Sequence, residues 1–170
     1  MVGVRGEIGV RLDLTHIGSG DLGSPTMRVN LEKLITLYEG TDATNKADIL
    51  FSDSRTLAAS ASENLDLAGV LADAFGATIT AAEIVAIYVA AAAGNTNNVQ
   101  VTRPASNGFV GPFLAAGDGL GVKPGESILL ASQSGWAVTA STGVILTVTN
   151  SAGGTSVSYD IVIVGRTVAA

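Results

Sequence analysis

The sequence predicts an all-β protein built as an antiparallel β-sandwich. Roughly eight or nine short segments with strand-like patterning recur at regular spacing, and no convincing helix interrupts them. Turn residues are abundant, since 21 of the 170 residues are glycine. The chain is 47% hydrophobic and only 14% charged, which argues against disorder. Its length suits one domain with a substantial core, so we expect residues 1–170 to form a single β-sandwich domain.

The first predicted strand lies near the N-terminus, where apolar and polar residues alternate. The apolar positions are Ile8, Val10, Leu12 and Leu14. A period of two is typical of a half-buried strand, with one face on the core and one in water. The stretch GSGDLGSP at 18–25 then predicts a loop, because it is rich in glycine and contains proline.

The segment 27–37 leaves two interpretations open. Its apolar residues share one parity, as in a strand, but Lys33 interrupts the pattern. Either Lys33 marks a β-bulge, or the stretch NLEKLITLYEG is a short helix capped by Asn30 and ended by Gly40. The shared parity favours the strand.

Four further segments precede residue 80. We expect an exposed polar loop at 39–48, an edge strand at 49–57 and short strands at 62–71 and 75–80. Leucines at alternate positions mark the strand at 62–71, where they would face the core.

The segment 79–101 also allows a helix or a strand. Thr80 and Glu83 form the spacing of a helix capping box, and Gly94 could end that helix. However, residues 84–89 are almost all β-branched or aromatic, which favours a strand. The turn-like GNTNN and the alternating VQVT that follow predict a hairpin across this turn.

The remaining third repeats the strand pattern. We expect an edge or irregular strand at 109–114 because of Pro112, and a long turn at 117–126. Strands are then predicted at 127–132, 135–140, 143–150 and 155–168.

Charged residues are concentrated in the first half of the chain. Residues 1–74 carry 17 of the 24 charged side chains. Either the second half supplies the central strands, or part of it is covered by other subunits. The sequence supports both interpretations equally.

Composition argues against several partners and chemistries. The net charge is −6 and basic residues do not cluster, so neither nucleic acid nor membrane is expected as a partner. No apolar run reaches the ~20 residues of a membrane-spanning helix, and no signal peptide is evident. The absence of cysteine excludes disulfides and thiolate chemistry.

Few residues are candidates for catalysis. His16 is the single histidine, and no G-x-S-x-G motif supplies a nucleophile for it, so we expect a surface or structural role. Asp53 and Arg55 are expected to form a local ion pair or to meet a neighbouring subunit. Glu63 and Asp66 resemble a glycosidase pair only in residue type, because nothing places them across a cleft.

Two other features also favour structural roles. The stretch GDGLG at 117–121 lacks the following Lys-Ser/Thr of a phosphate loop and the spaced carboxylates of a calcium loop. Trp136 lies in a strand-like segment, so it is expected in the core rather than on a sugar-binding platform. We therefore expect no enzyme activity, no catalytic residues, no cofactor and no metal site.

Several stretches resemble a group of tailed-bacteriophage virion proteins. They are ADILFSDSRTLAASASENLDLAGVLADAFGATIT (47–80), AAAAGNTNNVQV ending at Val101, KPGESILLAS (123–132), GWAVTASTG (135–143) and NSAGGTSVSYDIVIVG (150–165). The resemblance implies a sandwich of jelly-roll type and a place in the virion, and it supplies no catalytic residues. Residues 1–46 match least, and we expect an N-terminal strand plus a capsid-contacting arm there.

Three roles are compatible with that resemblance. The first is a head decoration, or cement, protein on the capsid exterior that stabilises the shell. Its expected partners are the major capsid protein and further copies of itself, as a dimer or trimer. The second is a minor tail or fibre-base protein that contacts glycans, and the third is a cell-wall hydrolase. The scarcity of aromatic residues weakens the second and the missing catalytic groups weaken the third, so the sequence favours the first.

Overall fold

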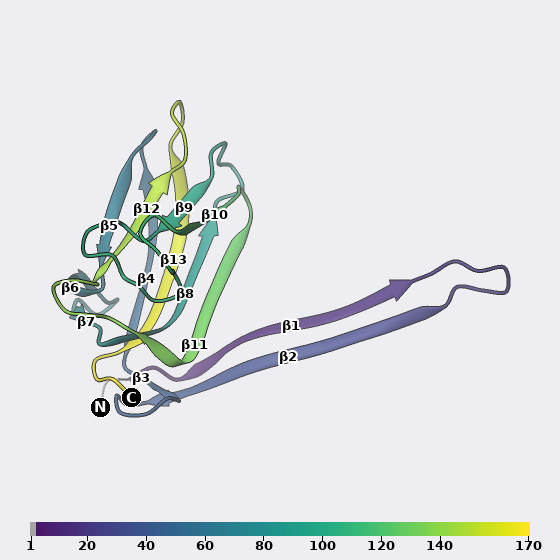
Figure 1. Ribbon diagram of the computed structural model, residues 1–170, viewed down its shortest axis with the longest axis horizontal. Coiled ribbons are helices and arrows are strands. Elements are labelled where there is room, and N and C mark those ends of the chain that lie inside the picture. Colours follow the sequence, from purple (N-terminus) through teal and green to yellow (C-terminus); the bar gives the residue numbers. More distant parts are fainter. Residues whose placement is uncertain (1–2) are drawn as a thin grey trace.

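The computed structural model describes residues 3–170, in which a long β-hairpin projects from a two-layer β-sandwich (Figure 1). These residues contain no helix, so the all-β prediction is confirmed. Residues 1 and 2 of the predicted 1–170 domain lie outside the described part. The strands are β1 (Gly6–Ile17), β2 (Thr26–Glu39), β3 (Lys46–Ala47), β4 (Ile49–Leu57), β5 (Ser62–Asp66), β6 (Ala68–Ala72), β7 (Thr78–Thr80), β8 (Glu83–Ala91), β9 (Val99–Thr102), β10 (Gly119–Val122), β11 (Ser127–Ala137), β12 (Ile145–Asn150) and β13 (Val157–Arg166).

The sandwich has two four-stranded sheets, in the orders β11-β8-β13-β4 and β10-β9-β12-β5. Every neighbouring pair in both sheets is antiparallel. From β4 onward the chain alternates between the sheets, except that β9 and β10 are neighbours in one sheet, and the short β6–β7 ribbon lies outside both. This alternation over eight strands gives the jelly-roll arrangement. The predicted antiparallel sandwich is therefore confirmed.

The core lies between the two sheets and is built almost entirely of aliphatic side chains. Leu65, Ile87, Val101, Leu146 and Ile163 are each fully buried there. The two central strands of each sheet, β8 with β13 and β9 with β12, all come from the second half of the chain. Their central position explains why residues 75–170 carry so few charges.

The segment at 79–101 contains strand β8, as predicted, and not a helix. Both faces of β8 are buried, since Ile84 and Ile87 face the core whereas Val85 and Ala86 lie in a second apolar cluster. This explains why the segment is apolar throughout.

The predicted hairpin between this strand and VQVT is wrong. Strand β8 pairs with β11 and β13, so both its edges are occupied, and β9 lies in the opposite sheet. The GNTNN stretch crosses between the sheets and is fixed by its side chains. Asn95 Nδ2 donates to the Ser158 carbonyl at 2.8 Å, and Asn97 Nδ2 donates to Asn150 Oδ1 at 3.0 Å.

Two predicted strand boundaries are also wrong. Segment 62–71 is divided into β5 and β6, because Asp66 Oδ1 accepts a hydrogen bond from the Ala68 amide at 2.9 Å and turns the chain. Conversely, the strands predicted at 127–132 and 135–140 are mostly one strand, β11, whose register shifts between Ala131 and Trp136. Gly135, at φ +79°, occupies this irregular stretch.

The predictions for 109–114 and 117–126 are both wrong, because the predicted strand is a loop and the predicted turn contains a strand. Residues 109–114 form a loop, and Phe109 and Phe113 insert from it into the core. The predicted turn at 117–126 contains the edge strand β10, which pairs with β9. The glycine-rich sequence GLGV does not favour a strand, although it forms one. The two phenylalanines favour a strand, although they lie in a loop.

The projecting hairpin is formed by β1 and β2, which pair in continuous register from Gly6↔Leu37 to Ile17↔Thr26 (Figure 1). Lys33 lies opposite Val10 within this ladder, so it marks neither a bulge nor a helix. We call this hairpin, residues 6–39, the arm. The prediction that its first strand is half-buried is wrong, because most of the strand lies beyond the sandwich and is exposed on both faces.

The polar segment at 39–48 is only partly the exposed loop that was predicted. Lys46 and Ala47 form β3, which runs parallel to the end of β2, and Ala47 is fully buried. This segment therefore joins the arm to the sandwich.

Candidate functional site

Among the described residues, no cluster of metal-ligating side chains is present. Between residues 3 and 170, no three His, Asp or Glu side chains lie close enough to share a metal ion. His16 is exposed on the arm, opposite Met27 in the ladder. Nor does this part of the chain contain a helix that could span a membrane.

Four polar residues form one cluster at an edge of the sandwich. They are Asp53, Arg55, Glu63 and Tyr159. Arg55 Nε lies 3.1 Å from Asp53 Oδ2, and Arg55 also pairs with Glu63 on the opposite sheet. Tyr159 donates a hydrogen bond to Glu63 Oε1 at 2.6 Å. Burial raises the pKa of the Tyr159 phenol, and the hydrogen bond to Glu63 raises it further. The cluster joins the two sheets, and its carboxylates are occupied by Arg55 and Tyr159.

The other predicted candidates are not brought into this cluster. Asp66 caps the turn after β5, and Asp118 accepts the Ala115 amide at 2.7 Å in the turn before β10. Trp136 is partly buried against the core, as expected. These positions explain the residues structurally, without a shared cleft.

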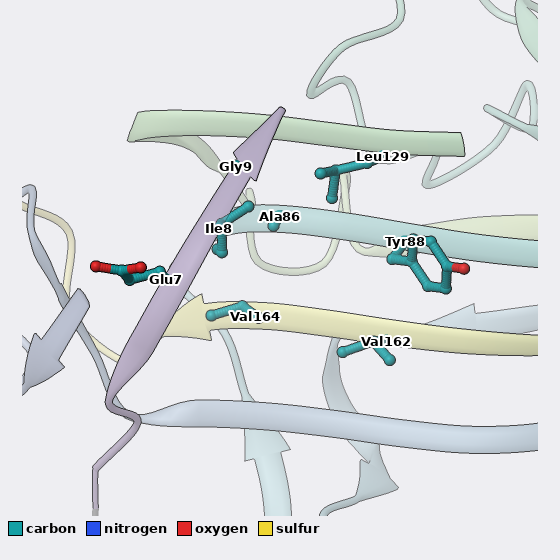
Figure 2. Close-up of a pocket in the computed structure, with 8 residues that line it drawn as sticks. All are labelled: Glu7, Ile8, Gly9, Ala86, Tyr88, Leu129, Val162 and Val164. Atoms are coloured by element: carbon teal, nitrogen blue, oxygen red, sulfur yellow. The ribbon is translucent and has the colours of Figure 1, made fainter. Parts of the chain in front are cut away.

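The arm is the feature with the greatest potential for function. At its base, Ile35 and Leu37 are buried against the outer face of the β11-β8-β13-β4 sheet, in a cluster with Val85, Ala86 and Val164. Figure 2 shows β1 crossing this sheet, with Ile8 directed at Ala86 and Glu7 directed away. Shallow apolar grooves of about 320 and 350 Å³ flank the crossing.

Beyond the base, the same face of the arm has nothing covering it. The ladder places Val10 opposite Lys33, Leu12 opposite Leu31 and Leu14 opposite Val29. We call this row the apolar face of the arm; its members are Val10, Leu12, Leu14, Met27, Val29 and Leu31. Exposure rises along this face from 2% at Leu37 to 60% at Leu31.

The opposite face of the arm is polar and largely satisfied by its own ion pairs. Arg28 donates to both carboxylate oxygens of Asp13, at 2.9 and 2.8 Å. Arg11 lies 3.6 Å from the same carboxylate. The hydrogen bond to Asp13 raises the pKa of Arg28. The charged groups of this face are paired with one another or exposed to water, whereas the apolar face exposes hydrophobic side chains to water.

The tip of the arm combines glycine with exposed apolar side chains. Leu22, in the GSGDLGSP loop, is fully exposed at 105%, and Ile17 and Met27 beside the loop are 67% and 60% exposed. A bridge between Gly20 and Gly23 closes the loop around Leu22. The tip therefore exposes three large apolar side chains to solvent.

A buried arginine fixes the base of the arm to the sandwich. Arg166, on β13, is fully buried and lies 2.7 Å from Glu83 Oε2 through Nη2. Its Nη1 donates to the carbonyls of Ala43 and Lys46, at 3.2 and 3.3 Å, in the segment that follows the arm. Its Nη2 donates to the Ser134 carbonyl at 2.9 Å, in the irregular part of β11. One guanidinium therefore ties together the arm base, β8, β11 and β13.

The sequence analysis expected an arm within residues 1–46, but it did not predict that the arm is a hairpin of two long strands that projects from the sandwich. The signal was present, because two amphipathic segments of similar length flank a Gly-rich loop. Alternation, however, reports which residues share a face and not what covers that face. The local sequence gave no signal for the role of Arg166, because all its hydrogen-bond partners are more than thirty positions away in the chain.

Comparison with known proteins identifies no family. No protein-family description matches the chain, and no curated protein matches its sequence significantly. Among solved structures, the chain is similar to one described under "Bacillus endospore appendages form a novel family of disulfide-linked pili". That similarity has a TM-score of 0.35 and 13% identity, and it covers 69% of this chain and 88% of the other. Values this low carry no argument about function.

Proposed function

We propose that this protein is a decoration, or cement, protein of a tailed-bacteriophage head, bound to the capsid exterior. The observation that carries the proposal is the arm: a long, exposed element whose apolar tip is not needed for the core of the sandwich. The sequence resemblance to phage virion proteins supplies the setting. The partner at the tip is then the major capsid protein.

The properties of the remaining surface agree with this role. A net charge of −6 disfavours a place against packaged DNA, because phosphates would repel it. The described part of the chain presents no group of side chains that could hold a metal ion. A structural module that binds other proteins requires none.

The stabilising mechanism is thermodynamic. A protein that binds the assembled shell, and not its separated subunits, shifts the equilibrium towards the shell by mass action. When the free protein is present at 100 times its dissociation constant, each binding site stabilises the shell by about 2.7 kcal/mol. The symmetry of the shell repeats this site many times.

Rebinding to undecorated heads tests the proposal. Heads lacking this protein are mixed with purified protein and heated, and DNA release is followed. Decorated heads should release DNA at a higher temperature. Equal release temperatures, or recovery of the protein only with tails, would instead support the tail or fibre-base alternative.

A pair of matched variants tests the role of the tip. Leu22→Asp changes the arm tip, whereas Leu114→Asp changes a residue on the sandwich that is 92% exposed. Neither side chain is buried in the single copy, so neither change should affect folding. Burial of one leucine side chain in an interface contributes about 1.5–3 kcal/mol. The Leu22→Asp protein should therefore bind heads at least tenfold more weakly. Leu114→Asp should bind as the unmodified protein does.

A further inference from the structure

We infer that the apolar face of the arm binds the same face of a second copy of this chain, so that two arms pack face to face. The inference names a partner for the arm and rests on the proposal that the arm is an assembly element. It concerns the side of the arm and leaves Leu22, in the loop at the tip, free for the shell.

The apolar face is incomplete in a single copy. A two-stranded ribbon alone is at best marginally stable in water, and it needs a covering layer on its apolar side. At the base that layer is the chain's own sheet, which buries Ile35 and Leu37 to 7% and 2% exposure. Further out, Leu12 is 44% exposed and Leu14 58%. The uncovered face is thus a direct continuation of an interface that is already formed.

The charges on the arm favour a copy of the same face over a charged partner. The carboxylates of the ladder, such as Asp13 and Glu32, lie on the polar face, where Arg28 and Arg11 are their neighbours. On the apolar face, Lys33 lies at the inner end, His16 lies opposite Met27 at the outer end, and the positions between them are uncharged. A two-fold interface places a patch against itself, and an uncharged centre allows this without repulsion.

The exposed area is sufficient for a specific dimer. Five residues of this face are about half exposed: Val10 53%, Leu12 44%, Leu14 58%, Met27 60% and Leu31 60%. At about 200 Å² for a fully exposed residue of this size, they leave roughly 500 Å² per copy, as much as the largest apolar patch of a typical monomer. Two such faces supply the ~1,000 Å² that a biological interface requires.

Substitutions on the two faces of the arm provide the test. Leu31→Glu places a charge at the centre of the apolar face, and Leu34→Glu makes the same change on the polar face, where the leucine is 47% exposed. Oligomeric state is measured on the full chain by analytical ultracentrifugation over a concentration series. Because each substitution occurs twice in a dimer, Leu31→Glu should weaken association by roughly 100-fold, at about tenfold per site. Leu34→Glu should associate normally.

Charge complementation then identifies the surface that Leu31 meets. Leu12 and Leu31 lie midway between the covered base and the tip, so in a two-fold pairing they face their counterparts. Mixing the Leu31→Glu and Leu31→Lys proteins should therefore restore association that neither shows alone. A mixture that stays dissociated would overturn arm-to-arm packing and favour the grooves beside Tyr88 and Leu129 as the partner surface.

The outcomes separate this inference from the proposed function. An unmodified protein that stays monomeric but binds heads would refute the inference and leave the decoration role intact. A dimer that forms through the arms but never binds heads would refute the decoration role alone.

Discussion

Removal of the buried Arg166 guanidinium is the most decisive test of how the arm is held. In Arg166→Met, Glu83 loses its ion-pair partner while remaining only 8% exposed. The carbonyls of Ala43, Lys46 and Ser134 lose a donor as well. Breaking a buried pair by removing one partner costs about 3–5 kcal/mol, because the remaining charge is left uncompensated.

Urea unfolding of the full chain measures this cost. With a slope of about 2 kcal/mol per molar urea, the midpoint should fall by roughly 2 M. Glu83→Gln together with Arg166→Met should cost less than the two single changes added, since the double variant leaves no buried charge. A loss below about 1 kcal/mol in the single variant, or strict additivity in the double, would refute the reasoning.

The other predictions concern the inter-sheet cluster and two glycines. Tyr159→Phe should lower the free energy of unfolding by about 1–3 kcal/mol, because Glu63 loses a buried donor. Because the pKa of Tyr159 is raised in the folded protein, Tyr159 stabilises the fold fully below its unfolded pKa of about 10, and this stabilisation is lost as pH rises further. Unfolding curves at increasing pH should therefore show a smaller decline in stability for Tyr159→Phe than for the unmodified protein. Gly135→Ala should destabilise strongly by thermal unfolding, since φ is +79° and a Cβ would lie 2.5 Å from Arg166 Nη2. Gly154→Ala is the matched control: φ is +95° but nothing lies within 4 Å of the added atom, so backbone strain of about 1 kcal/mol is the whole cost.

Local patterns predicted the sandwich well because most of its strands carry their own signal. β12 and β13 are rich in β-branched residues, and β8 is apolar on both sides because both its faces are covered. Where the prediction failed, the deciding contact was distant in sequence. β8 and β9 are adjacent in the chain, yet the pairing of β8 with β11 and β13 sends β9 to the other sheet.

The candidate site was only partly predictable for the same physical reason. Alternation in residues 8–14 predicts an apolar face, and the structure confirms that these residues share one. Whether that face meets a core depends on where the chain turns next, which is fixed by Arg166 and by the packing of Leu37. The pairing of Asp53 with Arg55 was one of two predicted alternatives, because the two residues are near in sequence. Tyr159 and Glu63, which are 96 positions apart, were not linked.

The central claim is that the arm joins this protein to a virion shell, and imaging of intact particles by electron cryomicroscopy tests it most directly. The account predicts density for the β-sandwich outside the capsid, with arms paired between copies and their tips, including Leu22, in contact with the shell. Sandwich density confined to the tail, or arms that extend into solvent without touching shell or neighbour, would contradict it.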